Sequence, residues 1–282
     1  MIILAATGVF AQTKIDISGT VEWDTMQIKA AVSLDLASAG IKLPAGRTQG
    51  ESILSAGYLN LIRAGILDLQ VDSSSTIREL VDRGELKLFE AEALAFNAQT
   101  IPPALSPDMK SMYSSYTITL TGVSSALLKH SRPAQVARTL NPVSSAQYTG
   151  IIIIASENLP VYSMKSTARA IPCLFPKIWD SDMNLLYERT MLLSHDNSMV
   201  RYLPSENIFH KNPSGLSPEL QEFVGDKPLR IFARGVFGIN PTDLIIDRED
   251  AMLIISSEEN RRLLSQGKVA IILDDSVLRR EF

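Results

Sequence analysis

The chain has 282 residues, 45% of them apolar and 21% charged, and its mean hydropathy lies near zero. This composition is typical of a folded protein of about two domains and excludes a disordered one. The net charge of −4 argues against a nucleic-acid surface, because phosphate binding needs clustered Lys and Arg. The adjacent basic pairs Arg261-Arg262 and Arg279-Arg280 are interpreted as a solvated helix face and a solvated tail.

The first residues, MIILAATGVFAQ, form a short apolar run with Val9 and Ala11 at the −3 and −1 positions of a signal-peptidase cut before Gln12. The run lacks a positively charged start, so residues 1–12 are interpreted as a signal-peptide remnant; a buried first strand is the alternative. We expect an exported mature chain that begins near Gln12. No later apolar stretch reaches about 18 residues, so no transmembrane segment is expected in the mature chain.

Residues 13–130 predict an α+β domain in which helices pack on one face of an antiparallel sheet. Two alternating runs within Lys14–Leu36 flank the polar pair Asp24-Thr25 and indicate a β-hairpin. Thr76 and Glu79 have the spacing of a helix capping box. The other expected elements are a helix from Thr48 or Ser52 to about Ile66 with Ile53, Leu54, Leu61 and Ile62 on its apolar side, helices at Thr76–Asp82 and Glu85–Ala98, the latter ended by Pro102-Pro103, a strand at Tyr113–Val123 and a short helix at Ser124–His130.

Residues 131–147, rich in Pro, Arg, Ser and Asn, predict a linker to a second domain at 148–282. This domain is expected to be a β-rich α+β unit with one main helix. Its central strand is Tyr148–Ala155 (YTGIIIIA), because four successive isoleucines indicate a strand covered on both faces. The last strand, Lys268–Asp274, is expected beside that strand or beside Leu229–Ala233.

The main helix of the second domain is expected to begin at Asp247 and Asp250 and to run through about Leu264. Gly267 is placed to stop it. The polar, proline-broken stretch His195–Pro228 is interpreted as a surface excursion.

One acidic cluster invites a metal interpretation. Asp180, Asp182 and Asn184 have the D-x-D-x-N spacing that opens a calcium loop. The match ends there, because Leu185 stands where the loop needs Gly and Met191 where it needs Glu. A β-hairpin turn rich in Asp and Asn is the favoured interpretation.

The other candidate groups also favour structural interpretations. Cys173, the single cysteine, lies in an apolar run and predicts a buried, inert thiol. Glu22 and Asp24 could share one face of a strand for acid–base chemistry, although a hairpin end favours two solvated carboxylates. Three histidines lie in polar loops without metal-ligand spacing: His130, His195 and His210. We therefore predict no catalytic, cofactor-binding or metal-binding residues and no enzymatic activity.

Six segments of the C-terminal half occur in a fixed order: YTGIIIIA, PCLFPKIWDSDMNLLYE, MVRYLPS, VGDKPLRIFARGV, NPTDLIIDREDAMLI and LLSQGKVAIILD. In this order they resemble secreted bacterial envelope proteins related to flagellar assembly proteins T and P, the latter of outer-membrane lipoprotein type. The N-terminal part, with VDSSSTIREL, resembles the small α+β module of the same group. The resemblance implies a periplasmic or outer-membrane-associated protein without catalytic residues. It also implies envelope partners, flagellar basal-body components among them, and self-association.

The sequence thus predicts a non-enzymatic, exported envelope protein that works through protein–protein contacts. Its contact surfaces are expected at the edges of the hairpin Lys14–Leu36 and the strand Tyr113–Val123, because an unpaired edge can accept a strand from another subunit. A glycan- or small-ligand-binding module that uses the loop Ser194–Pro228 is the alternative, and a hydrolase with an unrecognised site is a third hypothesis. Four aromatic residues could either form an exposed glycan-binding surface or pack in pairs across strands: Trp23, Tyr58, Tyr113 and Tyr116.

Overall fold

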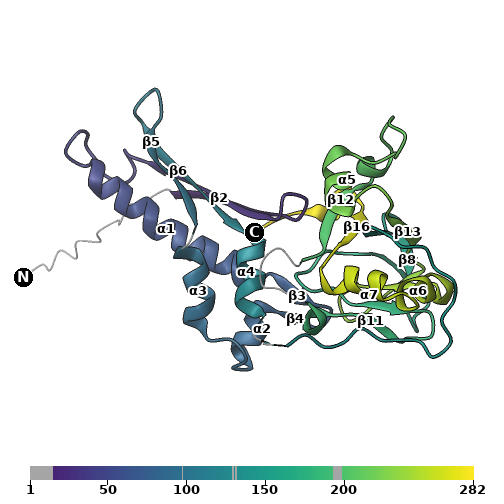
Figure 1. Cartoon of the computed structure of the whole chain (residues 1–282). Helices are drawn as coiled ribbons and strands as arrows, with labels where there is room; N and C mark the ends of the chain where they lie inside the picture. The colour runs from purple at the N-terminus through teal and green to yellow at the C-terminus, as the bar shows by residue number, and fades with distance from the viewer. Residues whose placement is uncertain (1–14, 97, 129, 131, 193–198) are drawn as a thin grey trace, which may run out of the picture.

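The protein consists of two lobes that lie side by side (Figure 1). The computed structural model describes residues 15–282 except 97, 129, 131 and 193–198, so the signal-peptide prediction for residues 1–12 and the position of His195 lie outside the described residues. With 28% helix and 31% strand in two domains, the structure confirms the predicted α+β class. Within the described residues, every helix is too short or too polar to span a bilayer.

The N-terminal lobe is built on an antiparallel five-stranded sheet of order β17-β1-β2-β6-β5. Strands β1 and β2 pair from Ile15 opposite Leu34 to Glu22 opposite Gln27, which confirms the predicted hairpin. The strands are β1 (Ile15–Glu22), β2 (Gln27–Asp35), β5 (Gln99–Leu105), β6 (Ser111–Thr119) and β17 (Arg279–Glu281).

Helix α1 (Arg47–Leu67) covers one face of this sheet. Leu54 and Ile62 of this helix are fully buried. The ring of Tyr58, also on the helix, stacks on Tyr116 of β6 with ring centroids 3.5 Å apart. The helix begins after Gly46, earlier than the expected caps Thr48 and Ser52. The preceding turn explains the early start, because the Gly46 N–H already donates to the Lys42 carbonyl and no side-chain cap is made.

Helix α2 (Ile77–Asp82) starts with the predicted capping box. The Thr76 hydroxyl accepts from the Glu79 N–H, and the Glu79 carboxylate accepts from the Thr76 N–H at 2.6 Å. Together these bonds satisfy two backbone donors at the helix start.

Two other predictions for the N-terminal lobe are wrong. Pro102-Pro103 do not end a helix, since α3 (Leu88–Phe96) ends earlier and both prolines lie in the edge strand β5. An edge strand tolerates proline, and a register shift between Ile101 and Ala104 accommodates the pair. The strand expected at Tyr113–Val123 ends at Thr119, because Leu120 and Val123 turn into the core on α4 (Leu120–Leu127).

The edge expected at β6 is wrong, and the edge expected at the hairpin is only partly open. Strand β6 pairs on one side with β2 and on the other with β5. Strand β1 is covered along Thr20–Glu22 by β17, which comes from the far end of the chain. This pairing could not be seen in the local pattern of the hairpin.

The C-terminal lobe contains a four-stranded parallel sheet of order β12-β16-β7-β13. Ile151, Ile152 and Ile153 of β7 are buried, as expected for a strand between two parallel neighbours. The strand predicted at Lys268–Asp274, β16, pairs beside β7, the first of the two predicted positions. The strands are β7 (Ile151–Ile154), β12 (Arg201–Pro204), β13 (Leu229–Phe232) and β16 (Val269–Leu273).

A second sheet of order β11-β10-β15-β14 completes this lobe, together with two short hairpins. The β10–β11 pair confirms the predicted hairpin around the Asp- and Asn-rich turn. The strands of this sheet are β10 (Ile178–Asp180), β11 (Leu185–Tyr187), β14 (Gly235–Phe237) and β15 (Asp243–Ile246). One hairpin pairs β8 (Asn158–Pro160) with β9 (Thr167–Arg169). The other pairs β3 (Gln70–Asp72) with β4 (Ser75–Thr76) and extends from the N-terminal lobe.

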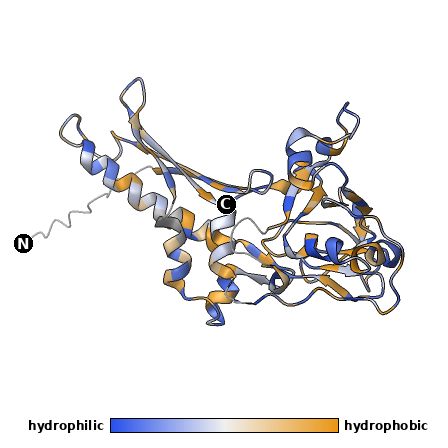
Figure 2. Ribbon diagram, in the orientation of Figure 1, coloured by the Kyte–Doolittle hydropathy of each residue, from blue (hydrophilic) through white to orange (hydrophobic). Residues whose placement is uncertain are grey.

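The helices of the C-terminal lobe correct two predictions. The single main helix is divided into α6 (Arg248–Ile255) and α7 (Glu258–Ser265), because the Ser257 hydroxyl accepts from the Asn260 N–H and starts a new helix. The stretch His195–Pro228 contains the buried strand β12 and helix α5 (Pro218–Val224), so it is not a surface excursion. In Figure 2 the strands are mainly apolar, whereas α7 is mainly hydrophilic.

The two lobes are joined at both ends of the C-terminal domain. After α8 (Asp275–Leu278), β17 adds to the N-terminal sheet, so Arg279-Arg280 lie in a paired strand and not in a tail, although both are exposed as predicted. The ring of Phe282 packs where a Cβ on Gly19 or Gly65 would lie. Two glycines therefore make the space that the ring of Phe282 occupies.

We predict opposite effects for Gly→Ala at two positions of α1. Gly65→Ala places a methyl group against the Phe282 ring and should lower the free energy of unfolding by about 1–3 kcal/mol through overpacking. Gly57→Ala meets Val32 at an ordinary 3.6 Å and should raise it by about 0.5–1 kcal/mol through helix propensity. Urea denaturation measures both.

Phe282→Ala should rescue Gly65→Ala, because it removes the atoms that the new methyl group meets. A loss of stability from Gly65→Ala that persists in the Phe282→Ala background would contradict the proposed packing of Phe282 against Gly65.

Candidate functional site

The groups considered for metal binding and nucleophilic chemistry occupy structural positions. Cys173 is buried, as predicted, and burial raises the pKa of its thiol. The Asp180 carboxylate accepts from the N–H groups of Asp182 at 3.0 Å and Asn184 at 2.7 Å, which confirms the turn interpretation. Among the described residues, no three His, Cys, Asp or Glu side chains gather to hold a metal ion.

Glu22 and Asp24 form separate ion pairs. Lys29 binds Glu22 at 2.5 Å, and this contact lowers the pKa of the Glu22 carboxyl. Arg279 of β17 reaches Asp24 at 3.4 Å. The two carboxylates therefore belong to the junction of β1, β2 and β17 and do not form an acid–base pair.

The structure decides the open question about the aromatic residues. Trp23, Tyr58 and Tyr116 are buried. The hypothesis that they form an exposed glycan-binding surface is therefore wrong, and the packing interpretation is confirmed for these three. Tyr113 is 49% exposed, so it is the one of the four that is not buried. Trp23 packs edge to face on Tyr202 of the other lobe, with ring centroids 5.7 Å apart.

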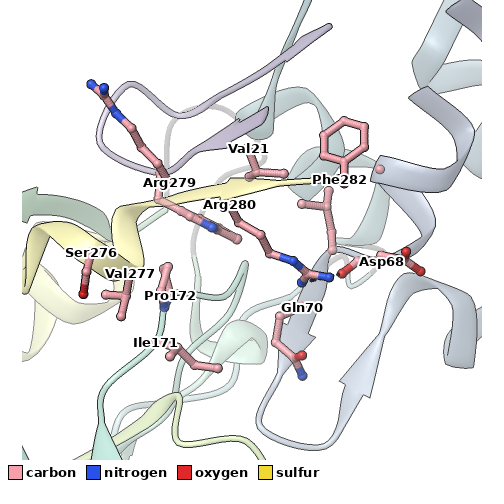
Figure 3. A pocket seen from close by; sticks show the side chains of 13 residues that line it. Val21, Asp68, Gln70, Ile171, Pro172, Ser276, Val277, Arg279, Arg280 and Phe282 are labelled. Atoms are coloured by element: carbon pink, nitrogen blue, oxygen red, sulfur yellow. Dashed lines mark hydrogen bonds between the residues drawn. The ribbon is translucent and has the colours of Figure 1, made fainter. Parts of the chain in front are cut away.

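A cavity of about 260 Å³ lies where the two lobes meet (Figure 3). The N-terminal lobe contributes Val21, Trp23 and Leu69, and the loop Ile171-Pro172 faces them from the C-terminal lobe. Phe282 on the returning strand completes the apolar wall. The cavity thus depends on the docking of β17 and could not be predicted from either domain alone.

The charges at this cavity come from β17 and the end of α1. The Asp68 carboxylate is paired with Arg78 at 2.6 Å, and its backbone carbonyl accepts from Arg280 at 3.2 Å. In the described part of the chain, no ion pair is found for the Arg280 guanidinium. An apolar cavity with a cation at its rim has the chemistry to hold a small amphiphilic anion.

Beyond the cavity, a buried carboxylate joins the lobes. Asp243 of β15 is fully buried and accepts a 3.0 Å hydrogen bond from Ser73 of the β3–β4 turn. The Trp179 indole N–H and the Lys177 N–H also donate to it, at 3.4 and 3.3 Å. Burial raises the pKa of Asp243, and these donors partly offset that effect. No local pattern indicates this contact, because Ser73 and Asp243 are 170 residues apart.

A second hollow, of about 510 Å³, lies on the C-terminal lobe beside β13. Ile154 and Ile208 line this β13 groove with two exposed aromatic rings, Phe209 at 75% and Phe232 at 62% exposure. Arg230 lies on the same face of β13 as Phe232, and its guanidinium donates to the Ser214 carbonyl. Ile208 and Phe209 belong to the loop Ser194–Pro228 that was the alternative ligand-binding site, whereas Phe232 lies in a short segment without a motif and was not predicted.

Asp243→Asn should change how stability depends on pH. The folded-state pKa of Asp243 is raised above its unfolded value of about 3.9. The stabilising contribution of the protonated carboxyl is therefore complete below the unfolded pKa and is lost as pH rises through the folded pKa. Urea unfolding at a series of pH values should show the wild type losing stability relative to Asp243→Asn across this window.

The exposed Asp16 provides the matched control, because Asp16→Asn removes one carboxylate without touching the buried junction. If the wild type instead gains stability relative to Asp243→Asn as pH rises, the donated hydrogen bonds outweigh burial and the stated direction is wrong.

Comparison with known families gives two matches that follow the two lobes. Residues 14–126 match the N-terminal domain of Treponema pallidum Tp0624, and residues 150–275 match its second domain. Neither match is to flagellar assembly protein T or P, so the matches support similarity to a bacterial family and not the finer resemblance to those two proteins. A comparison with curated proteins finds no match. The chain thus carries, in order, an N-terminal domain and a second domain similar to those of the bacterial protein Tp0624.

Proposed function

We propose that this chain is a non-enzymatic, exported protein of the bacterial cell envelope that works through protein–protein contacts. The observation that best supports this function is the exposed apolar surface of the C-terminal lobe. Phe209 and Phe232 stand 75% and 62% exposed beside a hollow of about 510 Å³. Exposed aromatic side chains that lie beside such a hollow are typical of a surface that binds a partner.

The backbone next to these rings is suited to bind a partner strand. Strand β13 is an edge of its sheet, and the N–H groups of Leu229 and Ala233 donate to β7. In a parallel ladder every second residue bonds to the neighbouring strand. Arg230 and Phe232 are the alternate residues, so their N–H and C=O groups point away from β7. An added strand would bind these groups while its side chains contact the β13 groove.

The edges of the N-terminal sheet are less suited to this role. Pro102-Pro103 interrupt β5, and proline removes the N–H groups that a partner strand would need. We therefore place the contact surface on β13 and not on the hairpin or strand named from the sequence.

The envelope location comes from the interpretation of residues 1–12 as a signal remnant. Within the envelope, the flagellar basal body is the finer proposal, and it comes from the sequence resemblance to flagellar assembly proteins T and P. The match to domains of a bacterial protein supports only the bacterial part of this proposal.

A second candidate function, small-ligand binding, is favoured by the cavity between the lobes. Its apolar wall and the Arg280 guanidinium at its rim fit a small amphiphilic anion such as a medium-chain fatty acid. Trp23 lines the cavity, so its fluorescence would report on an occupant.

A photo-crosslinking amino acid at position 232 should capture a specific envelope protein in cells. The same group at Phe89, which is 64% exposed on α3, is the matched control and should capture nothing above background. Mass spectrometry identifies the adduct, and N-terminal sequencing of the purified chain should find a start near Gln12. Equal adducts at both positions, or a chain that stays in the cytoplasm, would contradict the proposal.

Ligand binding is tested in the Trp179→Phe variant. The chain has two tryptophans, so Trp23 is then the one that remains and gives the fluorescence signal. Titration with dodecanoate should change its fluorescence saturably, and Arg280→Ala should weaken the apparent affinity by roughly 5- to 10-fold, since it removes one charged contact. Arg261→Ala is the control, because Arg261 likewise donates to a backbone carbonyl but lies away from the cavity. A linear, unsaturable response would rule out this second function.

A further inference from the structure

We infer that the open edge of β13 pairs with the same edge of a second copy of this chain, across a two-fold axis, and joins two four-stranded sheets into one of eight strands. This inference deepens the proposed function and rests on it, because it takes β13 as the contact surface and names the occupant. A closed two-fold dimer is the commonest form of self-association in soluble proteins.

The edge has free backbone groups for such a pairing. Among the described strands, β13 pairs with β7 alone, and no described turn or loop forms a backbone hydrogen bond to the N–H or C=O of Arg230 or Phe232. In an antiparallel pair, two residues that face each other exchange both of their backbone hydrogen bonds. A β13–β13 pair centred on Ile231 therefore places Arg230 opposite Phe232 of the second copy, twice, with four backbone hydrogen bonds.

Side-chain chemistry favours this register over its neighbours. Pairing centred on Arg230 would set two guanidinium groups directly opposite each other, and pairing centred on Phe232 would set Arg230 opposite Arg234 of the second copy. Like charges in facing positions are destabilising. Moreover, the Arg230-centred register would oppose Phe232 to Pro228, which has no N–H to donate.

In the Ile231-centred register, the opposed side chains complement each other. Arg230 and Phe232 are both exposed on the groove face of β13, so each guanidinium would lie against the phenyl ring of the other copy. This is a cation–π contact, made twice by symmetry. The bond from Arg230 to the Ser214 carbonyl can persist, because a guanidinium carries five donors and its face stays available for stacking.

The dimer would also cover the apolar surface that motivates the proposed function. The two β13 grooves would lie side by side across the axis, with Phe209 and Ile154 of each copy close to the new contact. A strand from a different protein could use the same edge, but it would have to supply its own cation and ring in this spacing. The chain itself already has both.

The register is tested by disulfide crosslinking of two exposed positions, Arg230→Cys and Phe232→Cys. Facing residues of an antiparallel pair have Cα atoms about 5.5 Å apart, within disulfide reach, whereas the same residue in the two copies would be more than ~7 Å apart. An oxidised mixture of the two variants should form a crosslinked dimer, and either variant alone should not. The native Cys173 is buried, so it does not interfere.

Sedimentation of the uncrosslinked protein gives the second readout. Wild type should show a concentration-dependent dimer, and Arg230→Ala should weaken dimerisation roughly 5- to 30-fold through loss of two Arg–Phe contacts. Arg201→Ala is the control, since Arg201 lies over the Phe223 ring within its own chain at 4.5 Å from the centroid. Crosslinking of either variant alone as fast as the mixture would overturn the register.

A wild type that stays monomeric at all concentrations would overturn the inference itself. The proposed function falls separately. If a monomeric protein still captures an envelope protein through position 232, the contact surface stands and only the second copy is wrong. If neither a dimer nor an adduct forms, both are wrong.

Discussion

The pairing of β17 with β1 is the contact on which the arrangement of this molecule depends. Only three residue pairs form the ladder, from Thr20 opposite Glu281 to Glu22 opposite Arg279. The contact continues on both sides, through the Trp23 N–H to the Leu278 carbonyl at 2.9 Å and the Phe282 N–H to the Gly19 carbonyl at 3.0 Å. Because these bonds connect the last residues of the chain to its first strand, they close the two lobes into one unit.

The β3–β4 hairpin makes the reciprocal connection. It extends from the N-terminal lobe, and its Gln70 and Val71 carbonyls accept from Leu174 and Phe175 at 2.9 and 2.8 Å. Ser73 at its turn reaches Asp243. Each lobe thus supplies a strand or hairpin to the other, and one continuous apolar core runs through both. Two such connections oppose the independent hinge motion that a linker alone would permit.

Local patterns in the sequence predicted elements whose partners are near in the chain. The hairpin of β1 and β2, the capping box of α2 and the turn at Asp180 were found because alternation, spacing and turn residues carry these signals. The four isoleucines of β7 also placed the centre of the second domain correctly. Burial on both faces produces such a run whatever the order of the neighbouring strands.

The failures share a different cause. Strand β12 was hidden in a proline-rich stretch, since a buried strand of four residues is too short for any periodicity to be recognised. The strand β17 resembles a basic tail in sequence, because its side chains are exposed and its backbone partner β1 lies at the other end of the chain. The cavity, the Ser73–Asp243 bond and the β13 groove all need residues from distant segments. A single sequence does not show which distant segments pair with each other, so these three sites could not be predicted from it.

The same topology explains why the two hollows differ in their suitability for a protein partner. The cavity between the lobes measures about 260 Å³ and is bordered by β17 and Phe282, which leaves room for a small molecule. The β13 groove adjoins an open strand edge, where outward-pointing backbone groups lie next to two exposed aromatic rings. Backbone pairing supplies direction and register, whereas burial of the rings supplies most of the free energy. A surface that combines both has the properties needed for assembly, and the fixed lobes would then be carried as one body by whatever pairs with β13.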